Sequence, residues 1–328
     1  MDKINEIENL IGKDYVREAI SELKLLVVQD KTLNDTLTII EGSFNQLSNE
    51  VMRGQLDNAE KNIQLGRVRS SLISLCGDVR RERPFWDTRT DEEKRDEQRL
   101  IISKMKFATI NSGTFLMGSE NGLDNEKPCH EVKIEKKFQI GVTPITQKQW
   151  KVIMDSEPWK GLSKIKEGDN YPATYIDWNG ANTFIKRINA IDAKNTYRFP
   201  TEAEWEYCCR AGSTTEFCFG DDERQLKIYG WYDENGEKAG LNYAQEVGLL
   251  ESNFWGIYDM HGNIWEWVND WYIDSYEPSK KYDFIDDRVL RGGGWDYSVF
   301  GARSSFRYHS KPSRTNHVIG FRVVKELP

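Results

Sequence analysis

The sequence predicts a small all-α helical bundle followed by an aromatic-rich α+β domain, and three observations support this. Apolar residues recur every three or four positions through residues 1–83. A charged stretch without an apolar stripe follows at 84–104. From residue 105 the chain changes to glycines, aromatic residues and short extended segments. We therefore expect two domains, 1–83 and 105–328, joined by a charged linker at 84–104.

The apolar spacing of the first region predicts an antiparallel bundle whose last two helices form a long hairpin. Gly54 suits the end of one helix, and Asp57 with Glu60 three residues later suits the cap of the next. Three series of residues carry the spacing: Val16, Ile20, Leu23 and Val27; Leu33, Leu37, Ile40, Phe44, Leu47 and Val51; and Leu65, Val68, Leu72, Leu75 and Val79.

Composition limits the classes of function. The chain has 45 basic and 53 acidic residues, a formal charge of −8, which argues against nucleic acid as a partner. The sequence has no run of about eighteen apolar residues that would cross a membrane, and its start lacks the apolar core of a secretory signal. The five cysteines form no CxxC pair, which is typical of free thiols in a reducing compartment. We expect a cytoplasmic protein without a membrane partner.

Regular elements are expected in the first half of the second domain. Pro200-Thr201 followed by Glu204 is a capping box that predicts a helix start. The loops that follow residue 210 should be long and fixed by buried tryptophan rings. The expected elements are a hairpin of strands 107–110 and 114–118, a strand at 138–142, and helices at 145–154, 178–191 and 201–210.

Residues 291–322 combine a glycine and arginine frame with a varied filling. Glycines 292–294 allow close backbone approach, Trp295 supplies an anchor, and residues 320–322 suit a buried final strand. Between them lie aromatic and small polar side chains, the mixture that antigen-combining loops use. The frame predicts a fixed backbone, and the filling predicts a binding surface.

Six phrases occur in one order along the second domain. They are FATINSGTFLMGS, VTPITQKQW, YPATYIDWNGANTFIKRIN, YRFPTEAEWEYCCRAG, FWGIYDMHGNIWEWVNDWY, and RVLRGGGW with IGFRVV. Together they resemble the formylglycine-generating enzyme, or sulfatase-modifying-factor, family over about residues 105–326. The resemblance implies an irregular α+β fold related to C-type lectins.

The resemblance also implies where catalysis would reside. The family's enzymes use two cysteines after the glycine run to bind copper and react with oxygen, chemistry that needs a thiolate. The matching positions here hold Tyr297 and Ala302, and the segment contains no cysteine. The histidines, at 130, 261, 309 and 317, lack the spacing of metal ligands. We expect a protein that is not an enzyme.

The RGGGW and GFR frame further resembles variable proteins of diversity-generating retroelements, in which the bracketed positions face a ligand. A loop that has diverged and binds nothing in particular is the alternative. The implied scaffold is Arg291, Trp295, Arg303, Arg307, Gly320 and Arg322. The implied ligand-facing set is Asp296, Tyr297, Ser298, Val299, Phe300, Ser304, Ser305, Tyr308, His309, Asn316 and His317.

A calcium site is the second candidate site. Asp259 and Glu266 frame a tight glycine turn, and a hard cation takes carboxylate and carbonyl oxygens. The family resemblance implies these two side chains and the carbonyls of Gly262 and Ile264 as ligands. The alternative is a loop closed by hydrogen bonds from Asn263 and Glu266. We expect a structural calcium ion.

The first domain carries its own resemblance. LIGKDYVREAISELKLL and the stretch from IIEGSF to SLISLC resemble the eleventh type of bacterial effector-associated domain. These adaptors are thought to recruit partners with the same domain, which implies a homotypic partner. A plain dimerisation or spacer bundle explains the periodicity equally well.

The expected function is non-catalytic capture of a macromolecular ligand, expected to be a protein, with the helical domain gathering partners. One alternative is an enzyme of the formylglycine-generating class with altered chemistry. Another is a structural assembly factor in a bacterial defence or signalling system.

Overall fold

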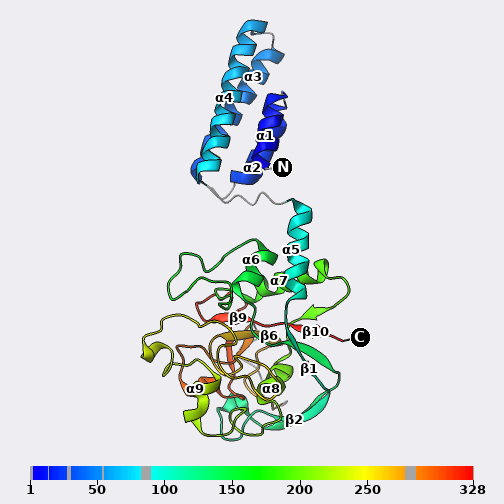
Figure 1. Ribbon diagram of the computed structural model, residues 1–328, viewed down its shortest axis with the longest axis vertical. Helices are drawn as coiled ribbons and strands as arrows, with labels where there is room; N and C mark the ends of the chain where they lie inside the picture. Colours follow the sequence, from blue (N-terminus) through cyan, green and yellow to red (C-terminus); the bar gives the residue numbers. More distant parts are fainter. Residues whose placement is uncertain are drawn as a thin grey trace. The chain divides into compact units, whose positions relative to one another are not determined.

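The computed structural model describes residues 3–13, 15–27, 31–53, 55–82, 90–277 and 286–327. The chain divides into two compact units, Met1–Lys94 and Arg95–Pro328 (Figure 1). Within the described ranges, no helix has both the length and the apolar content to span a membrane.

The first unit is a bundle of α1 (Lys3–Gly12), α2 (Val16–Val27), α3 (Lys31–Met52) and α4 (Asn58–Glu82). α3 and α4 lie antiparallel, which confirms the predicted hairpin (Figure 1). The Asp57 carboxylate accepts from the Glu60 amide at 2.8 Å, and the Glu60 carboxylate accepts from the Asp57 amide at 3.2 Å. The predicted cap of α4 is therefore confirmed, whereas Gly54 lies outside the described residues.

The helix α5 (Asp91–Ser103) occupies most of the stretch that the sequence predicts as a linker. Ile102 is buried in the main core of the second unit, and the Gln98 side-chain amide donates to the Val152 carbonyl at 3.3 Å. The end of the expected linker thus belongs to the second unit, because an isolated apolar pair, Ile101 and Ile102, anchors an otherwise charged helix.

The described residues of the second unit form three small β-sheets, in the strand orders β1-β4-β10-β5, β2-β3 and β8-β7-β6-β9. β1 pairs with β4 and β2 with β3, so the predicted hairpin of β1 and β2 is wrong. The chain changes sheets within the two residues between these strands, and no local turn signal reports the distant partners. The strands are β1 (Phe107–Ile110), β2 (Gly113–Met117), β3 (His130–Ile134), β4 (Phe138–Gly141), β5 (Tyr197–Arg198), β6 (Trp265–Trp271), β7 (Arg288–Arg291), β8 (Tyr308–Ser310), β9 (Ile319–Phe321) and β10 (Val324–Glu326).

The expected helices of the second unit form close to their predicted bounds. They are α6 (Gln147–Met154), α7 (Trp178–Ile191) and α8 (Glu202–Arg210). Thr201 caps α8, and Glu204 completes the capping box that the sequence predicts. Short helical turns complete the unit: η1 (Asp124–Glu126), η2 (Glu223–Gln225), α9 (Leu226–Tyr229), η3 (Glu237–Ala239) and η4 (Val299–Ala302).

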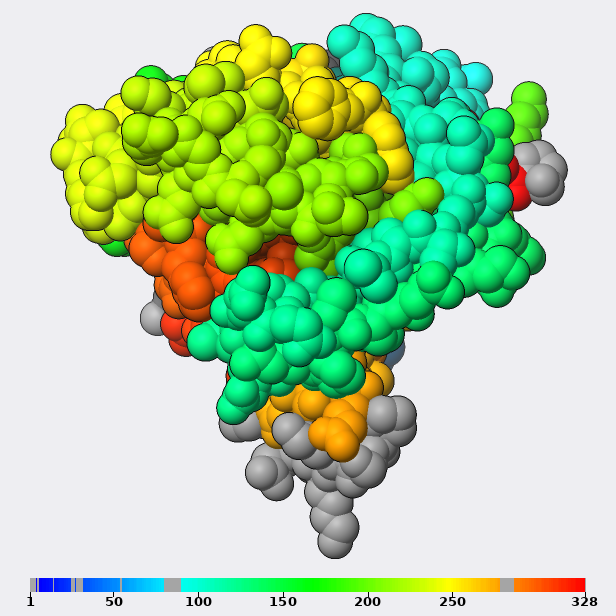
Figure 2. All heavy atoms as spheres, turned by 90° about the horizontal axis from the view of Figure 1, so that it is seen from below, coloured from blue at the N-terminus to red at the C-terminus, as the bar shows by residue number. Residues whose placement is uncertain are grey.

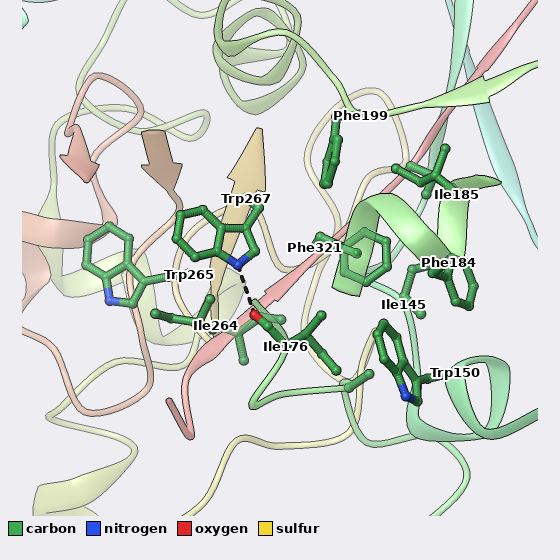
Figure 3. Close-up of a cluster of buried hydrophobic side chains, with 14 of the residues drawn as sticks. Ile145, Trp150, Ile176, Phe184, Ile185, Phe199, Ile264, Trp265, Trp267 and Phe321 are labelled. Atoms are coloured by element: carbon green, nitrogen blue, oxygen red, sulfur yellow. Dashed lines mark hydrogen bonds between the residues drawn. The ribbon is translucent and has the colours of Figure 1, made fainter. Parts of the chain in front are cut away.

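The strand β6 separates two layers of different chemistry. Trp265 and Trp267 enter the apolar core, where the Trp267 indole donates to the Ile176 carbonyl at 2.9 Å (Figure 3). Glu266, between them, points to the opposite face because successive strand residues alternate. β9 is buried and runs parallel to β6, which brings the GNIWEW and GFR phrases together and confirms a buried strand close to residues 320–322. It is not the final strand that the sequence predicts, because β10 follows it.

Candidate recognition surface

The glycine run shapes the turn that follows β7. Gly292 and Gly293 have φ values of 103° and 87°, a region that disfavours residues with a Cβ. A Cβ on Gly293 would lie 3.0 Å from the Gly301 carbonyl oxygen. Trp295 is buried, and its amide donates to the Asn263 carbonyl at 3.0 Å. The turn therefore approaches the backbone of η4 closely, which is the close approach that the glycines predict.

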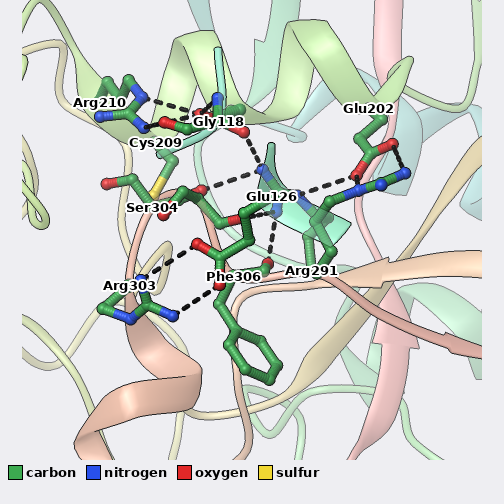
Figure 4. Close-up of polar contacts among 12 residues, drawn as sticks. Gly118, Glu126, Glu202, Cys209, Arg210, Arg291, Arg303, Ser304 and Phe306 are labelled. Carbon is green, nitrogen blue, oxygen red and sulfur yellow. Dashed lines mark hydrogen bonds and ion pairs between the residues drawn. The ribbon is translucent and has the colours of Figure 1, made fainter. Parts of the chain in front are cut away.

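Arg291 fixes the backbone of the segment that follows η4. Its buried guanidinium pairs with Glu206 and donates to the carbonyls of Ser304, at 3.0 Å, and Ser305, at 2.9 Å (Figure 4). A further bond reaches the Phe306 carbonyl. One side chain thus holds three consecutive peptide groups in place.

Arg303 and Arg307 anchor the same segment at two more points. The Arg303 guanidinium pairs with both Glu126 oxygens at 2.7 and 3.1 Å. Arg307 pairs with both Glu202 oxygens at 2.6 and 2.9 Å. Burial raises the pKa of Glu202, but Arg307 and Arg291 outweigh this effect and leave the pKa below its usual range. Every residue of the implied scaffold is buried: Arg291, Trp295, Arg303, Arg307, Gly320 and Arg322.

The implied ligand-facing residues fall into three groups. Tyr297, Phe300 and Tyr308 are exposed, at 38%, 42% and 43%, as is Ser298. A second group is half-buried: Asp296, Val299, His309, Asn316 and His317.

Ser304 and Ser305 are buried, so their expected exposure is wrong. Arg291 binds their carbonyls, and the Ser304 amide donates to the Glu216 carbonyl at 2.8 Å. These backbone bonds hold both residues inside the unit.

The three exposed rings rest on two buried ones. Tyr297 and Tyr308 lie 5.3 and 5.1 Å from Trp265, between ring centroids. Phe300 meets the Phe306 ring edge-to-face at 5.3 Å. We call Tyr297, Phe300 and Tyr308 the aromatic patch. The spacing of residues within 291–322 did not indicate that Trp265 and Phe306 support the patch. The tryptophans of the GNIWEW phrase were the one sequence feature that pointed to buried rings of this kind.

Polar side chains next to the patch are also held in place. The His317 ring lies 2.8 Å from an Asp296 oxygen, and the His309 ring lies 2.6 Å from an Asp287 oxygen. The Asn316 side-chain oxygen accepts from the Val318 amide at 2.7 Å. The surface is thus a set of rings and polar groups on a fixed backbone.

Comparison with known proteins agrees with this architecture. Residues 93–327 match the family model of the sulfatase-modifying factor enzyme 1-like domain. The chain belongs to this family. Residues 2–80 match the model of effector-associated domain 11. The second unit is therefore a sulfatase-modifying-factor domain with a C-type-lectin-like α+β fold, and a helical effector-associated domain precedes it.

Individual relatives show the breadth of this family. The inactive Cα-formylglycine-generating enzyme 2 of Mus musculus is 26% identical over 269 residues, covering 64% of this chain and 82% of that protein. The serine/threonine-protein kinase pkn1 of Chlamydia caviae is 25% identical over 330 residues, 91% of this chain. The chain spans only 50% of that kinase's length. The structure of Treponema denticola variable protein 1 shares the fold, with a TM-score of 0.59 at 23% identity, covering 68% of this chain and 95% of that one.

The two positions that the family resemblance implies for catalytic cysteines hold other residues, the buried Ala302 and the exposed Tyr297. Two cysteines elsewhere in the domain, Cys208 and Cys209, are buried. Burial raises the pKa of Cys209 to about 12 and that of Cys208 well above its usual value. Both thiols are therefore protonated at neutral pH. Among the described residues, no three His, Cys, Asp or Glu side chains cluster as metal ligands.

The expected calcium ligands are engaged in other bonds. Arg322 donates to both Glu266 oxygens at 2.6 Å, and the Trp205 indole donates to one of them at 2.9 Å. The Gly262 carbonyl accepts from the Ile264 amide at 2.9 Å. Since the Arg322 guanidinium occupies both Glu266 oxygens, a calcium ion would have to displace it to bind them.

Asp259 and Asn263, in the same loop, are also engaged in hydrogen bonds. An Asp259 oxygen accepts from the Gly248 amide at 2.8 Å. The Asn263 side chain bonds both backbone groups of Gln245, at 2.9 and 3.2 Å. Oxygens of Asp259, Gly262 and Glu266 therefore already accept bonds that a calcium ion would have to replace, and the Asn263 bonds match the alternative of a loop closed by hydrogen bonds.

A cavity of about 350 Å³ lies elsewhere in the domain. Its lining includes Lys136, Arg198 and Glu326 and none of the implied ligand-facing residues. Arg198 is already paired with Glu204 and Glu326, at 2.6 and 3.0 Å. The cavity therefore adds nothing to the recognition surface.

Proposed function

We propose that this protein is a non-catalytic, cytoplasmic ligand-binding protein that captures a protein ligand on the aromatic patch. The observation that carries the proposal is the arrangement of three exposed rings on a backbone fixed by buried arginine–glutamate pairs. In the same proposal, the helical domain recruits a partner that carries a domain of its own kind.

The physical chemistry of the patch favours binding. Aromatic side chains dominate the energetic centre of protein interfaces because they bury a large area at low entropic cost. Here the rings pack on Trp265 and Phe306, so little motion is lost when a ligand covers them. The neighbouring Asp296 and His317 supply polar groups for the rim.

The same arrangement suits a variable protein of a diversity-generating retroelement. The buried hydrogen bonds and ion pairs of Arg291, Arg303 and Arg307 fix the backbone without using a side chain of the patch, and only Arg303 also stacks on a patch ring, that of Phe300. Exposed side chains can therefore change while the fold is kept. A reverse-transcriptase gene and a template repeat of codons 291–322 beside this gene would support the assignment, and their absence would count against it.

The decisive experiment is selection from a displayed library of protein fragments. We expect the full chain to enrich binders, and a variant with Tyr297→Ala, Phe300→Ala and Tyr308→Ala to lose them. Both proteins should melt within about 3 °C of each other, because substitutions at exposed sites cost little. The control variant replaces three exposed apolar residues outside the patch by alanine: Leu116, Leu249 and Phe254. Equal loss of binding in the control variant would contradict the proposal.

An assay for residual catalysis separates binding from altered enzymatic chemistry. The purified chain is incubated with a CxPxR peptide, copper and oxygen, and the aldehyde is measured. We expect no product, since neither the patch nor the protonated thiols of Cys208 and Cys209 can bind copper as thiolate. An aldehyde at any rate above the enzyme-free mixture would overturn the non-catalytic assignment.

A further inference from the structure

An acidic stretch of the chain borders one end of the aromatic patch. The Asp233 amide donates to the Tyr297 carbonyl at 2.9 Å, which joins residues 221–238 to the patch. Val299 packs on a buried cluster that contains Phe217 and Tyr232. Figure 2 shows the orange segment near residue 300 at the surface beside the yellow-green segment that includes residues 221–238.

Carboxylates outnumber cations at this border. Four cations accompany the carboxylates: Lys164, Arg224, Lys227 and Lys238. The carboxylates number seven: Asp221, Asp222, Glu223, Asp233, Glu234, Glu237 and Asp296. Three negative charges therefore remain in excess. We call these seven residues the acidic rim.

The ion pairs within this border are long or exposed to solvent. Lys238 bridges Asp233, at 2.9 Å, and Glu234. Lys164 lies 3.7 Å from Glu237 and 3.9 Å from Asp296. Such exposed pairs contribute little stability and can exchange partners when a ligand arrives.

Three of the carboxylates lie near one buried ring at this border. Burial raises the pKa of the Tyr232 hydroxyl, and Glu234, Asp233 and Glu223 raise it further. Asp233 and Asp296 adjoin Tyr297, Asp233 through its backbone hydrogen bond and Asp296 as the preceding residue. Negative charge therefore borders the Tyr297 end of the patch.

We infer that the aromatic patch and acidic rim together bind a cationic protein segment, in which lysine or arginine side chains stand beside apolar or aromatic residues. The inference rests on the proposed function. Ring faces attract cations, and within the fold the Arg303 guanidinium already stacks 4.0 Å from the Phe300 ring. The rim would steer such a segment to the patch and repel an acidic one.

A synthetic peptide array tests the inference with the full chain. Every peptide carries the same aromatic and aliphatic residues, and only the balance of Lys and Arg against Asp and Glu varies. We expect the wild-type chain to prefer cationic peptides, with affinity falling as sodium chloride rises from about 0.05 to 0.5 M, because exposed charges are screened.

Two matched variants assign the preference to the rim. Glu234→Gln with Glu237→Gln should weaken binding of cationic peptides about three- to tenfold, as expected for two interface charges. Glu131→Gln with Glu135→Gln removes two exposed glutamates from β3 and the turn after it, and should change nothing. If both variants weaken binding equally, the preference for cationic peptides comes from the net charge of the whole chain and not from the acidic rim, and the inference is overturned.

A third variant separates the inference from the proposed function. Tyr297→Ala with Tyr308→Ala should weaken binding of all peptides that the wild type retains. If this variant loses binding but the peptides that the wild type binds are neutral or acidic, the inference fails and the proposed function stands. If those peptides bind the variant as well as they bind the wild type, the inference and the proposed function both fail.

Discussion

At the residue scale, Arg307 is bonded through all three of its guanidinium nitrogens beneath the recognition surface. Besides Glu202, it donates to the carbonyls of Asn125 and Ile273 at 2.7 and 2.8 Å. Arg307→Ala would leave Glu202 buried with only the longer contacts to Arg291, at 3.7 Å, and Tyr276, at 3.4 Å, so we expect the free energy of unfolding to fall by about 3–5 kcal/mol. Urea unfolding measures this change.

The matching control is Arg307→Lys. A lysine keeps the charge but lacks the planar fork that reaches both Glu202 oxygens, so we expect it to recover only part of the loss. A loss below about 1 kcal/mol for Arg307→Ala would mean that the ion pairs do not fix the segment.

Asp270 makes the stability depend on pH. Burial, and next the charge of Glu202, raise its pKa from 3.8 to about 6. The folded chain therefore holds a proton that the unfolded chain releases between about pH 4 and 6, and this contribution to stability is lost as the pH rises through that window. Asp270→Asn removes the titration and keeps an oxygen for the Glu202 amide.

We expect the stability of Asp270→Asn, relative to wild type, to increase by roughly 1–3 kcal/mol from pH 4 to pH 7 and to level off above. Parallel urea titrations at each pH measure the difference. A difference that stays constant with pH, or that shrinks toward pH 7, would contradict the raised pKa.

The role of a single residue could be predicted from the sequence where its type suits one structural role, such as a glycine with positive φ or a tryptophan that anchors a turn. The glycines at 292 and 293 and the buried Trp295 are examples. Sequence reasoning failed for Ser304, because burial there depends on carbonyls that Arg291 binds. It also did not indicate that Glu266 pairs with Arg322, because that partner lies far along the chain.

At the element scale, α5 is a charged helix with one apolar end. Ile102 is buried in the core of the second unit, whereas Leu100 is half exposed. We expect Ile102→Ala to lower the free energy of unfolding of this unit by about 2–4 kcal/mol, the cost of a cavity. Leu100→Ala should cost less than about 0.5 kcal/mol. Equal effects in thermal melts of the two variants would show that α5 does not belong to the unit.

Elements could be predicted where their information is local. Helices α7 and α8 follow from apolar spacing and from caps at Asp177 and Thr201. Strand partners could not be predicted in the same way, since β1 pairs with β4 in a sheet that also contains the last strand, β10. The role of Ile101 and Ile102 in anchoring the charged helix α5 could not be predicted either, because residues far along the chain form the core that buries Ile102.

At the scale of the whole molecule, each unit has its own apolar core. The recognition surface lies entirely in the second unit, which contains the aromatic patch, its supporting rings and the glutamates that hold its backbone. The proposed recruitment by the bundle and the proposed capture by the patch can therefore be tested separately. A chain of residues 1–83 that reproduced all ligand binding would identify an assembly factor and contradict the proposed division.

The most direct measurement is saturation mutagenesis of residues 291–322 with two readouts, resistance to proteolysis and capture of a selected ligand. We predict that substitutions at Tyr297, Phe300 and Tyr308 keep the fold and abolish capture. Substitutions at Arg291, Arg303 and Arg307 should destroy the fold. If the exposed positions prove as intolerant as the buried arginines in the proteolysis readout, or if capture survives their replacement, the surface is not a recognition surface supported by an independent scaffold.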